Sequence, residues 1–449
     1  MSTIIFLVQK NIIIGYTNVI RSLKRGRNLM AIDKNKTNQL IKDIDELFET
    51  FTKPLPKEAR EFLKEKVMGP VFDEVRKIIK ESRPPVIFLI GRSGHGKSSL
   101  LNALANRQVA EVGDIKPTTP ESIPYEINFN DRYATWSVID TRGIFETTKP
   151  DGALAEDATE ILKKDILKYK PDIILHVISA SEIRNLSNDM KVFRDIKSKL
   201  KKETEIHVPT IIAMNKVDTL GNPRDWPPEE NGKKAALIKE ALDYMTMDVL
   251  NVNSFQKIDL NIGIKGYEIY NDEYMGIIPV CSLEGDLWNI EALSEFVGNQ
   301  LPDEALIDFY QAQERKDQLK KLSTSIIKRF ATIAGTIGAS PVPISDILVL
   351  TPMQLLMIAI IGGLSCREFN KETAYEFLAA AGINIGAAFG FRTAAHQLIK
   401  LIPIAGWIGS GAIAASGTYA IGKSAEAYFF SGEIRKPEEY KREWESESK

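Results

Sequence analysis

The chain contains little cysteine and little histidine. Its 449 residues include 2 Cys and 4 His. Cys281 and Cys366 lack the spacing of a disulfide framework, and no Cys/His pattern has the spacing of a zinc site. A disulfide-stapled secreted fold and a structural zinc site are therefore excluded, and a reducing cytosolic environment is the simplest interpretation.

The chain also lacks a strong excess of charge of either sign. The 58 Lys and Arg nearly balance the 60 Asp and Glu, which gives a net charge of −2. This balance excludes a generally basic, nucleic-acid-binding surface, although it leaves a local patch open. The hydrophobic content of 44% and the length are sufficient for two or three domains.

A cleavable secretory signal is missing from the first thirty residues. The apolar runs Ile4–Val8 and Ile12–Ile14 are interrupted by Lys10, and the basic residues 21–27 follow them instead of preceding them. Two interpretations stay open: a short amphipathic membrane anchor, or an extension upstream of a start at Met30.

Residues 91–98 read G-R-S-G-H-G-K-S and match the phosphate-binding pattern G-x-x-x-x-G-K-[ST]. The apolar run Val86–Ile90 precedes them and Ser99–Ala105 follows them, which predicts the strand-to-helix turn that the pattern requires. Backbone N–H groups of such a loop and the helix N-terminus bind phosphates. The alternative is a glycine-rich turn without a ligand.

Each residue of this loop has an expected role. Lys97 reaches the β and γ phosphates and is a predicted catalytic residue, while Ser98 places its hydroxyl on Mg²⁺. We expect Ser99 to cap the helix and the His95 side chain to close the nucleotide edge, since a histidine with no visible partner is poor evidence for a general base. The loop residues predicted to bind the nucleotide are Gly91, Ser93, Gly94, His95, Gly96, Lys97, Ser98 and Ser99.

Two further segments are predicted to meet the metal and the γ-phosphate. The strand pattern 134–140 ends in Asp140-Thr-Arg-Gly143, where the carboxylate holds Mg²⁺ through water and the Gly143 N–H meets the phosphate. Upstream, the segment Lys116–Pro120 is placed where a switch supplies a threonine to the metal. We favour Thr119 over Thr118 as metal ligand and catalytic residue, and a Pro-rich turn is the alternative.

Residues 215–218 read N-K-V-D and follow the apolar run Thr210–Met214. The Asp218 carboxylate can accept paired hydrogen bonds from N1–H and the 2-amino group of guanine. Adenine offers no such donors and would leave the carboxylate unpaired. We therefore predict guanine binding by Asn215, Lys216 and Asp218, with an ordinary strand-end turn as the alternative.

A last strand and a closing loop are predicted over Ile277–Leu283, with Ser282 and Leu283 closing over the base. Between the guanine loop and this strand, residues 233–250 are predicted to be helical. Residues 257–262 and 266–270 are predicted to form either a small hairpin or an extended excursion. We assign no function to this excursion.

With these motifs in order, residues Pro85–Glu295 resemble the GTPase domains of the Era-like class, and Leu100–Leu104 is a supporting match. The resemblance implies an α/β fold with a mostly parallel central sheet, GTP or GDP and Mg²⁺ as ligands, and hydrolysis of GTP.

The sequence departs from relatives of this class at two positions. Ile144 occupies the place of the water-positioning Gln of Ras-like enzymes, and Gly94 that of an Asn with which many Era-like members bind a monovalent cation. We therefore expect slow or partner-stimulated hydrolysis. Arg142 is either a charge-stabilising group or a solvated surface residue.

The regions on both sides of this domain are predicted to be helical. Residues 38–83 show apolar positions at helical spacing. From 331 to 422 only eight of 92 residues are charged. Ile347–Cys366 and Leu401–Gly422 carry no charge and are long enough to cross a bilayer. Polar and helix-breaking residues within them fit a buried bundle of a soluble domain equally well.

A second resemblance concerns residues 320–430. Ser340–Gln354 and Lys400–Gly406 look like an uncharacterised helical domain attached to some bacterial Era-like GTPases and often linked with membranes. The order of helices, GTPase domain and helices is similar to that of immunity-related and dynamin-like GTPases.

The predicted domains are a leader (1–30), N-terminal helices (31–84), a GTPase domain (85–300), a helical domain (301–432) and a charged tail (433–449). We predict a GTP-hydrolysing switch coupled to a helical domain that associates with the cytoplasmic face of a membrane. Its expected partners are a guanine nucleotide and a membrane lipid or membrane protein. A homo-oligomer is left open, and nothing in the sequence indicates nucleic acid. The alternatives are a ribosome- or RNA-associated assembly GTPase and a soluble nucleotide-binding interaction protein.

Overall fold

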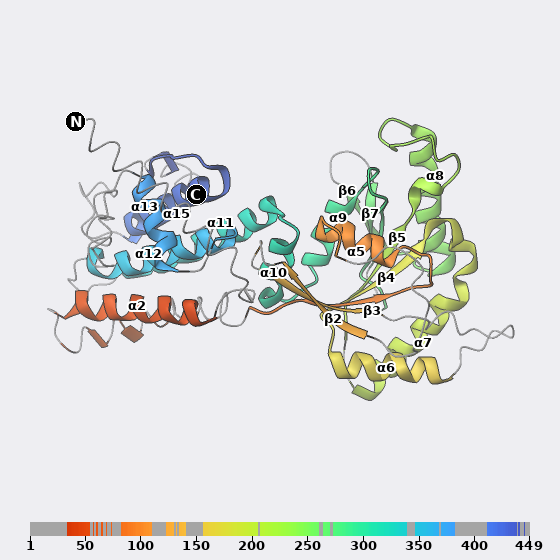
Figure 1. Cartoon of the computed structure of the whole chain (residues 1–449), viewed down its shortest axis with the longest axis horizontal. Coiled ribbons are helices and arrows are strands. Elements are labelled where there is room, and N and C mark those ends of the chain that lie inside the picture. Colours follow the sequence, from red (N-terminus) through yellow and green to blue (C-terminus); the bar gives the residue numbers. More distant parts are fainter. Residues whose placement is uncertain are drawn as a thin grey trace.

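The described part of the chain includes a central sheet domain and helices from both flanks (Figure 1). Apart from single positions between 57 and 73 and near the C-terminus, the computed structural model describes residues 34–53, 82–109, 123–129, 132, 134–140, 156–204, 207–259, 264–269, 273–338, 346–367, 370–381 and 411–437.

The sheet has the strand order β2-β3-β1-β4-β5-β8-β7-β6. β1 lies between β3 and β4 and is parallel to both, and β5 and β8 continue the parallel part. Their short apolar runs are typical of strands buried on both faces. The strands are β1 Val86–Ile90, β2 Ile123–Phe129, β3 Ala134–Asp140, β4 Ile173–Ser179, β5 Thr210–Asn215, β6 Phe255–Asp259, β7 Ile264–Ile269 and β8 Gly276–Pro279.

The sequence-predicted strands at 86–90, 134–140 and 210–214 are confirmed as β1, β3 and β5. The expected hairpin is also confirmed, because β6 and β7 pair antiparallel. Unexpectedly, β7 also pairs antiparallel with β8, so the hairpin extends the main sheet. The excursion between the guanine loop and β8 is thus an integral part of the domain.

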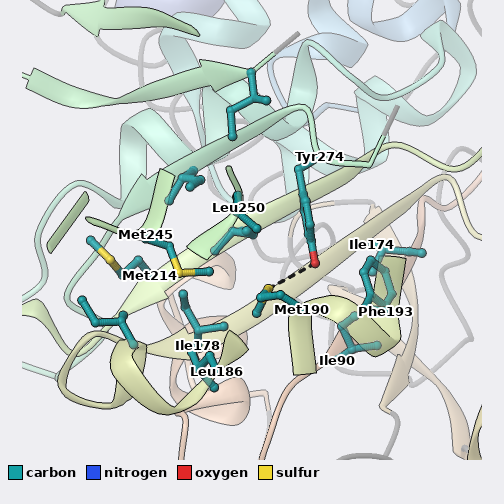
Figure 2. Packing of buried hydrophobic residues seen from close by; sticks show 14 of the residues in the cluster. Ile90, Ile174, Ile178, Leu186, Met190, Phe193, Met214, Met245, Leu250 and Tyr274 are labelled. Atoms are coloured by element: carbon teal, nitrogen blue, oxygen red, sulfur yellow. Dashed lines mark hydrogen bonds between the residues drawn. The ribbon is translucent and has the colours of Figure 1, made fainter. Parts of the chain in front are cut away.

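Helices cover the two faces of this sheet. The helices of the sheet domain are α5 Lys97–Ala105, α6 Glu156–Tyr169, α7 Ser187–Thr204, α8 Gly232–Asp243 and α9 Ile290–Gly298, with the short turns η3 Ala180–Asn185, η4 Val217–Thr219 and η5 Tyr244–Val249. On one face, Met190 and Phe193 of α7 pack with Met245 of η5 and Leu250 in one buried cluster (Figure 2).

The remaining helices form a bundle built from both ends of the chain. It contains α2 Lys34–Thr52, α11 Lys316–Gly338, α12 Asp346–Leu364, α13 Lys371–Ala380, α15 Gly411–Glu426 and η6 Ala427–Ser431, and α10 Asp303–Ala312 lies between bundle and sheet (Figure 1). Leu40, Ile44 and Phe48 of α2 are buried in the same core as α12. Lys371 Nζ lies 2.9 Å from Asp43 Oδ2. The N-terminal helix therefore packs on the far end of the chain.

Helix α12 carries most of the uncharged run 347–366 and is the centre of this bundle. Every side chain from Leu350 to Leu364 is buried. Gln354 Nε2 donates to Thr418 Oγ1 of α15 at 3.0 Å, which satisfies its amide nitrogen inside the core. This burial matches the bundle alternative. Among the residues that the structure describes, no helix is long and apolar enough to cross a membrane. The leader 1–30 and residues 401–410 lie outside the described residues.

Candidate nucleotide site

Five strands end at the same edge of the sheet, and the predicted site residues follow these ends. Asp140 ends β3 beside Leu89 of β1, and Ser179 ends β4 beside Asn215 of β5. β1 lies between strands reached by connections to opposite sides, which creates the switch point where α/β sheets bind ligands. The sheet thus brings the phosphate loop, the metal carboxylate and the guanine loop to one edge.

Glycine is required in the phosphate loop for two reasons, close approach of neighbouring strands and a left-handed backbone conformation. A Cβ on Gly91 would lie 2.2 Å from Val177 O, and one on Gly96 would lie 2.4 Å from Asn215 Nδ2. These two positions allow the loop to approach β4 and β5 closely. Gly94 has φ +75° with no atom within 4 Å of the added Cβ, so its conformation requires glycine while the space beside it is open.

The loop ends where α5 begins, at Lys97. Lys97 Nζ donates to Gly91 O (2.9 Å) and Arg92 O (3.3 Å), so its ammonium lies across the loop where phosphates are predicted. The helix N-cap is Gly96 in the left-handed conformation, without a side-chain cap. The expected capping role of Ser99 is therefore wrong, because the helix starts two residues earlier.

The His95 side chain differs from the prediction that it closes the nucleotide edge, because it is only 1% exposed. Its Nδ1 lies 3.2 Å from Val177 O and its Nε2 3.3 Å from Glu182 Oε2. Burial lowers the pKa of His95, against the opposing effect of Glu182. The ring fastens the loop to β4 and η3, and only the backbone of His95 is available to phosphates.

A second contact that holds the phosphate loop, an ion pair between Arg92 and Asp189, was not predicted from the sequence. Arg92 Nε and Nη2 donate to the two carboxylate oxygens of Asp189, at 2.7 and 2.9 Å. Asp189 is 2% exposed and lies in the first turn of α7, where an acidic residue also favours the helix dipole. The pairing raises the pKa of Arg92. No local pattern indicates Asp189, because its partner is 97 positions away.

Asn215 joins the phosphate loop to the loop after β8. Its Nδ2 donates to His95 O at 3.1 Å, and its Oδ1 accepts from Ser282 N (3.2 Å) and Ser282 Oγ (2.9 Å). The side chain is fully buried. The neighbouring Lys216 takes a left-handed φ of 61°. Its Cε lies 3.7 Å from a Cβ added to Gly96, which places the chain beside the phosphate loop.

Asp218 lies in the η4 turn that follows Asn215 and Lys216, and its carboxylate is held by a cysteine. The Cys281 thiol donates to Asp218 Oδ1 at 3.2 Å. Burial, together with this carboxylate, raises the pKa of Cys281 to about 12, so the thiol remains a donor at neutral pH. Ser282 is buried, whereas Leu283 is 54% exposed at the rim.

Of the three predicted metal ligands, Ser98 and Asp140 lie within the residues that the structure describes. Asp140 lies at the end of β3 and Ser98 in the first turn of α5, and a carboxylate and a hydroxyl are oxygen donors that suit Mg²⁺. The assignment of a magnesium ion to Ser98 and Asp140 stays a prediction. Thr119 and Gly143 lie outside the described residues, as do Thr118, Arg142 and Ile144.

Comparison with known proteins agrees with this geometry. The family described as "50S ribosome-binding GTPase" matches residues 86–216. The chain contains an Era-like P-loop GTPase domain. The matches to this GTPase family support GTP hydrolysis as the activity of the domain and are consistent with GTP or GDP and Mg²⁺ as its ligands.

Relatives of the GTPase domain include Era and MnmE proteins. The chain is 24% identical to GTPase Era of Thermoanaerobacter sp. (strain X514) over 233 residues, 52% of this chain and 72% of the relative. It is 37% identical to GTPase Era of Fusobacterium nucleatum over 35% of this chain and 46% of the relative. The tRNA modification GTPase MnmE of Ureaplasma parvum is 34% identical over 27% of this chain and 26% of its own length.

Among solved structures, Era in complex with MgGDPNP and a segment of 16S ribosomal RNA matches with a TM-score of 0.29 and 19% identity. That match covers 56% of this chain and 68% of that chain. The resemblance of residues 320–430 to a membrane-linked helical domain receives no support from these comparisons and stays a prediction.

Proposed function

We propose that the protein is a Mg²⁺-dependent GTP switch whose nucleotide state is transmitted to the helical bundle. The observation that carries this proposal is the position of Arg132, in the turn between β2 and β3. Its Nη1 donates to Ala105 O at the end of α5 (2.9 Å) and to Ala312 O at the end of α10. One buried guanidinium thus joins the nucleotide-binding helix to the first helix beyond the GTPase domain.

The two strands that flank this turn lead to the predicted switch segments. Lys116–Pro120 precedes β2, and Asp140 ends β3. The strands are paired over their whole length, from Ile123 opposite Asp140 to Phe129 opposite Ala134. A change of order at the switch segments when the γ-phosphate is lost would therefore act on both strands of one hairpin.

Helix α10 contacts this hairpin through an aromatic pair and a hydrogen bond. Trp136 of β3 stacks on Phe309 with ring centroids 5.6 Å apart, and its Nε1 donates to Asp308 O at 3.2 Å. In the last turn of the same helix, Gln311 Nε2 donates to Gly363 O of α12 at 2.8 Å. The contacts form an unbroken path from the hairpin to the bundle core.

The site residues assigned from the sequence stand as part of this proposal, with Lys97 and Thr119 as catalytic residues. The test is direct binding of GTP, GDP and ATP to Lys97→Ala and Asp218→Asn. We expect Lys97→Ala to lose at least tenfold in GTP affinity, because a charged phosphate contact disappears. We expect Asp218→Asn to lose about a hundredfold, because an amide cannot accept both guanine donors.

A comparison of GTP with ATP separates binding of the phosphates from recognition of the base. ATP should bind weakly to the wild type, and Asp218→Asn should bind GTP no better than ATP. Unchanged GTP affinity in both variants would refute the proposed site.

The location of the switch is a separate proposal. Docking on the cytoplasmic face of a membrane is suggested by the resemblance of residues 320–430 to a membrane-linked helical domain, since the low charge of α12 is accounted for by its burial in the bundle. The family description "50S ribosome-binding GTPase" supports the alternative of a ribosome-associated GTPase. Fractionation of cells with salt and carbonate washes, followed by sucrose-gradient sedimentation, separates the two. Comigration with lipid vesicles favours the first, and comigration with 50S subunits favours the second.

A further inference from the structure

We propose that residues 219–275, the insertion between the guanine loop and β8, brace the guanine pocket and determine base selectivity through Lys234 and Glu229. The inference rests on the proposed guanine site at Asp218. It assigns positioning residues to an excursion whose sequence carried no recognisable motif.

Lys234 of α8 holds the backbone of the guanine loop through its ammonium group. Its side chain is 0% exposed, and its Nζ donates to Asp218 O (2.7 Å) and to Leu220 O. A buried ammonium costs free energy, and in the first turn of a helix it also meets the positive end of the dipole. Two carbonyl acceptors on either side of Thr219 offset this cost. The contact therefore fixes the backbone that carries the base-reading carboxylate.

Glu229 holds the second loop of the pocket. Its Oε1 accepts from Trp288 Nε1 at 2.8 Å and from Lys265 Nζ at 3.3 Å, and the Lys265 ammonium lies 5.1 Å from the centre of the Trp288 ring. Trp288 in turn exchanges two backbone hydrogen bonds with Cys281, whose thiol meets Asp218. Trp288 is thus the link between the insertion and the Asp218 carboxylate.

Parts of the insertion are packed into the core of the sheet domain. Met245 and Leu250 are buried beside Met214 and Ile178 beneath the sheet (Figure 2). Tyr267 of β7 is fully buried and donates to Asp243 at the end of α8. Lys234 starts from α8, which is packed into the core, and Glu229 lies in the exposed turn before that helix. The contact of Lys234 therefore sets the position of the Asp218 backbone before the base arrives, and Glu229 supports the Trp288 side of the pocket. Such preorganisation favours the base whose two donors match the carboxylate.

The test compares the affinities for GTP and ITP, since ITP lacks the 2-amino group. In Lys234→Met we expect the preference for GTP over ITP to fall about tenfold, the usual effect of losing a hydrogen bond to a charged group. Lys233→Met is the matched control, because Lys233 is the exposed neighbour on the same turn. It should keep the wild-type preference.

A second variant protects the test against misfolding of Lys234→Met. Glu229→Gln affects a side chain that is 35% exposed, and it should lower the same preference about threefold while the circular dichroism spectrum stays unchanged. An unaltered GTP-to-ITP ratio in both variants would overturn the brace, even if their thermal stability falls. If Asp218→Asn also leaves the ratio unaltered, the proposed guanine site itself fails.

Discussion

His176 of β4 is a histidine that folding keeps neutral. Burial, helped by the nearby charges of His95 and Lys97, lowers the pKa of His176 from 6.5 to about 3. Its Nδ1 lies 3.2 Å from Tyr274 OH, and that hydroxyl donates to Met190 Sδ at 3.3 Å (Figure 2). Because Tyr274 OH donates to sulfur, its oxygen can accept from Nδ1–H of His176, and it is the burial of the ring that keeps it neutral. In the unfolded chain the same ring takes up a proton near pH 6.5.

This difference predicts how stability depends on pH. Because the folded pKa is depressed, His176 contributes full stability above pH 6.5 and loses it as pH falls toward 3, by about 1.4 kcal/mol per unit. In His176→Leu the free energy of unfolding, measured in urea at pH 6.5 and 5, should therefore fall by about 2 kcal/mol less than in the wild type. Replacing the exposed His207 by Leu is the control, and equal slopes in all three proteins would contradict the prediction.

At the scale of elements, the phosphate loop is fastened to α7 by the Arg92–Asp189 pair. Asp189→Asn keeps the shape of the side chain but removes its charge, so the free energy of unfolding should fall by about 2 kcal/mol. A displaced loop weakens contacts with phosphates and not with the base. We therefore expect GTP, GDP and ITP affinities to fall by one common factor, in contrast to Lys234→Met.

Isothermal titration of the three nucleotides checks this. Asp195→Asn, an exposed change on the same helix, should leave all three affinities as they are. A selective loss of GTP over ITP in Asp189→Asn would show that the pair acts on the base and not on the phosphates.

The elements that the sequence predicted are those whose signals are local. An apolar run followed by Gly91 or Asn215 marks a strand that ends in a binding loop, and β1 and β5 end there. The fastening residues could not be predicted in this way. Asp189 and Glu182 reach the loop only because β4 lies beside β1, and Lys234 reaches Asp218 only because α8 folds back beneath the η4 turn. Such contacts depend on the complete fold.

The composition of α12 likewise could not predict the surroundings of this helix. A helix that is apolar on all sides is typical of a membrane span and equally of a buried core. What decides between them here is the set of covering helices, including α2 from the other end of the chain, whose Phe48 lies in the same core. A sequence window of 20 residues contains no information about that partner.

At the scale of the whole molecule, Arg132 is the point where the GTPase domain meets the helices that follow it. Arg132→Met removes the donor from Ala105 O and Ala312 O, so we expect the free energy of unfolding to fall by about 2 kcal/mol. The nucleotide site lies at the opposite end of the hairpin from this turn, so GTP affinity should stay within about threefold of wild type.

The informative readout is the coupling between nucleotide and bundle. In the wild type, hydrogen exchange of α2 and α11 should differ between the GDP state and the state with a non-hydrolysable GTP analogue, because the hairpin acts on α10 and α10 contacts α12. In Arg132→Met this difference should disappear while binding persists. Lys320→Met, an exposed change on α11, should retain it. If Arg132→Met keeps the wild-type difference, the nucleotide signal reaches the bundle by another path, since the guanidinium that joins α5, the hairpin and α10 would then be a structural contact alone.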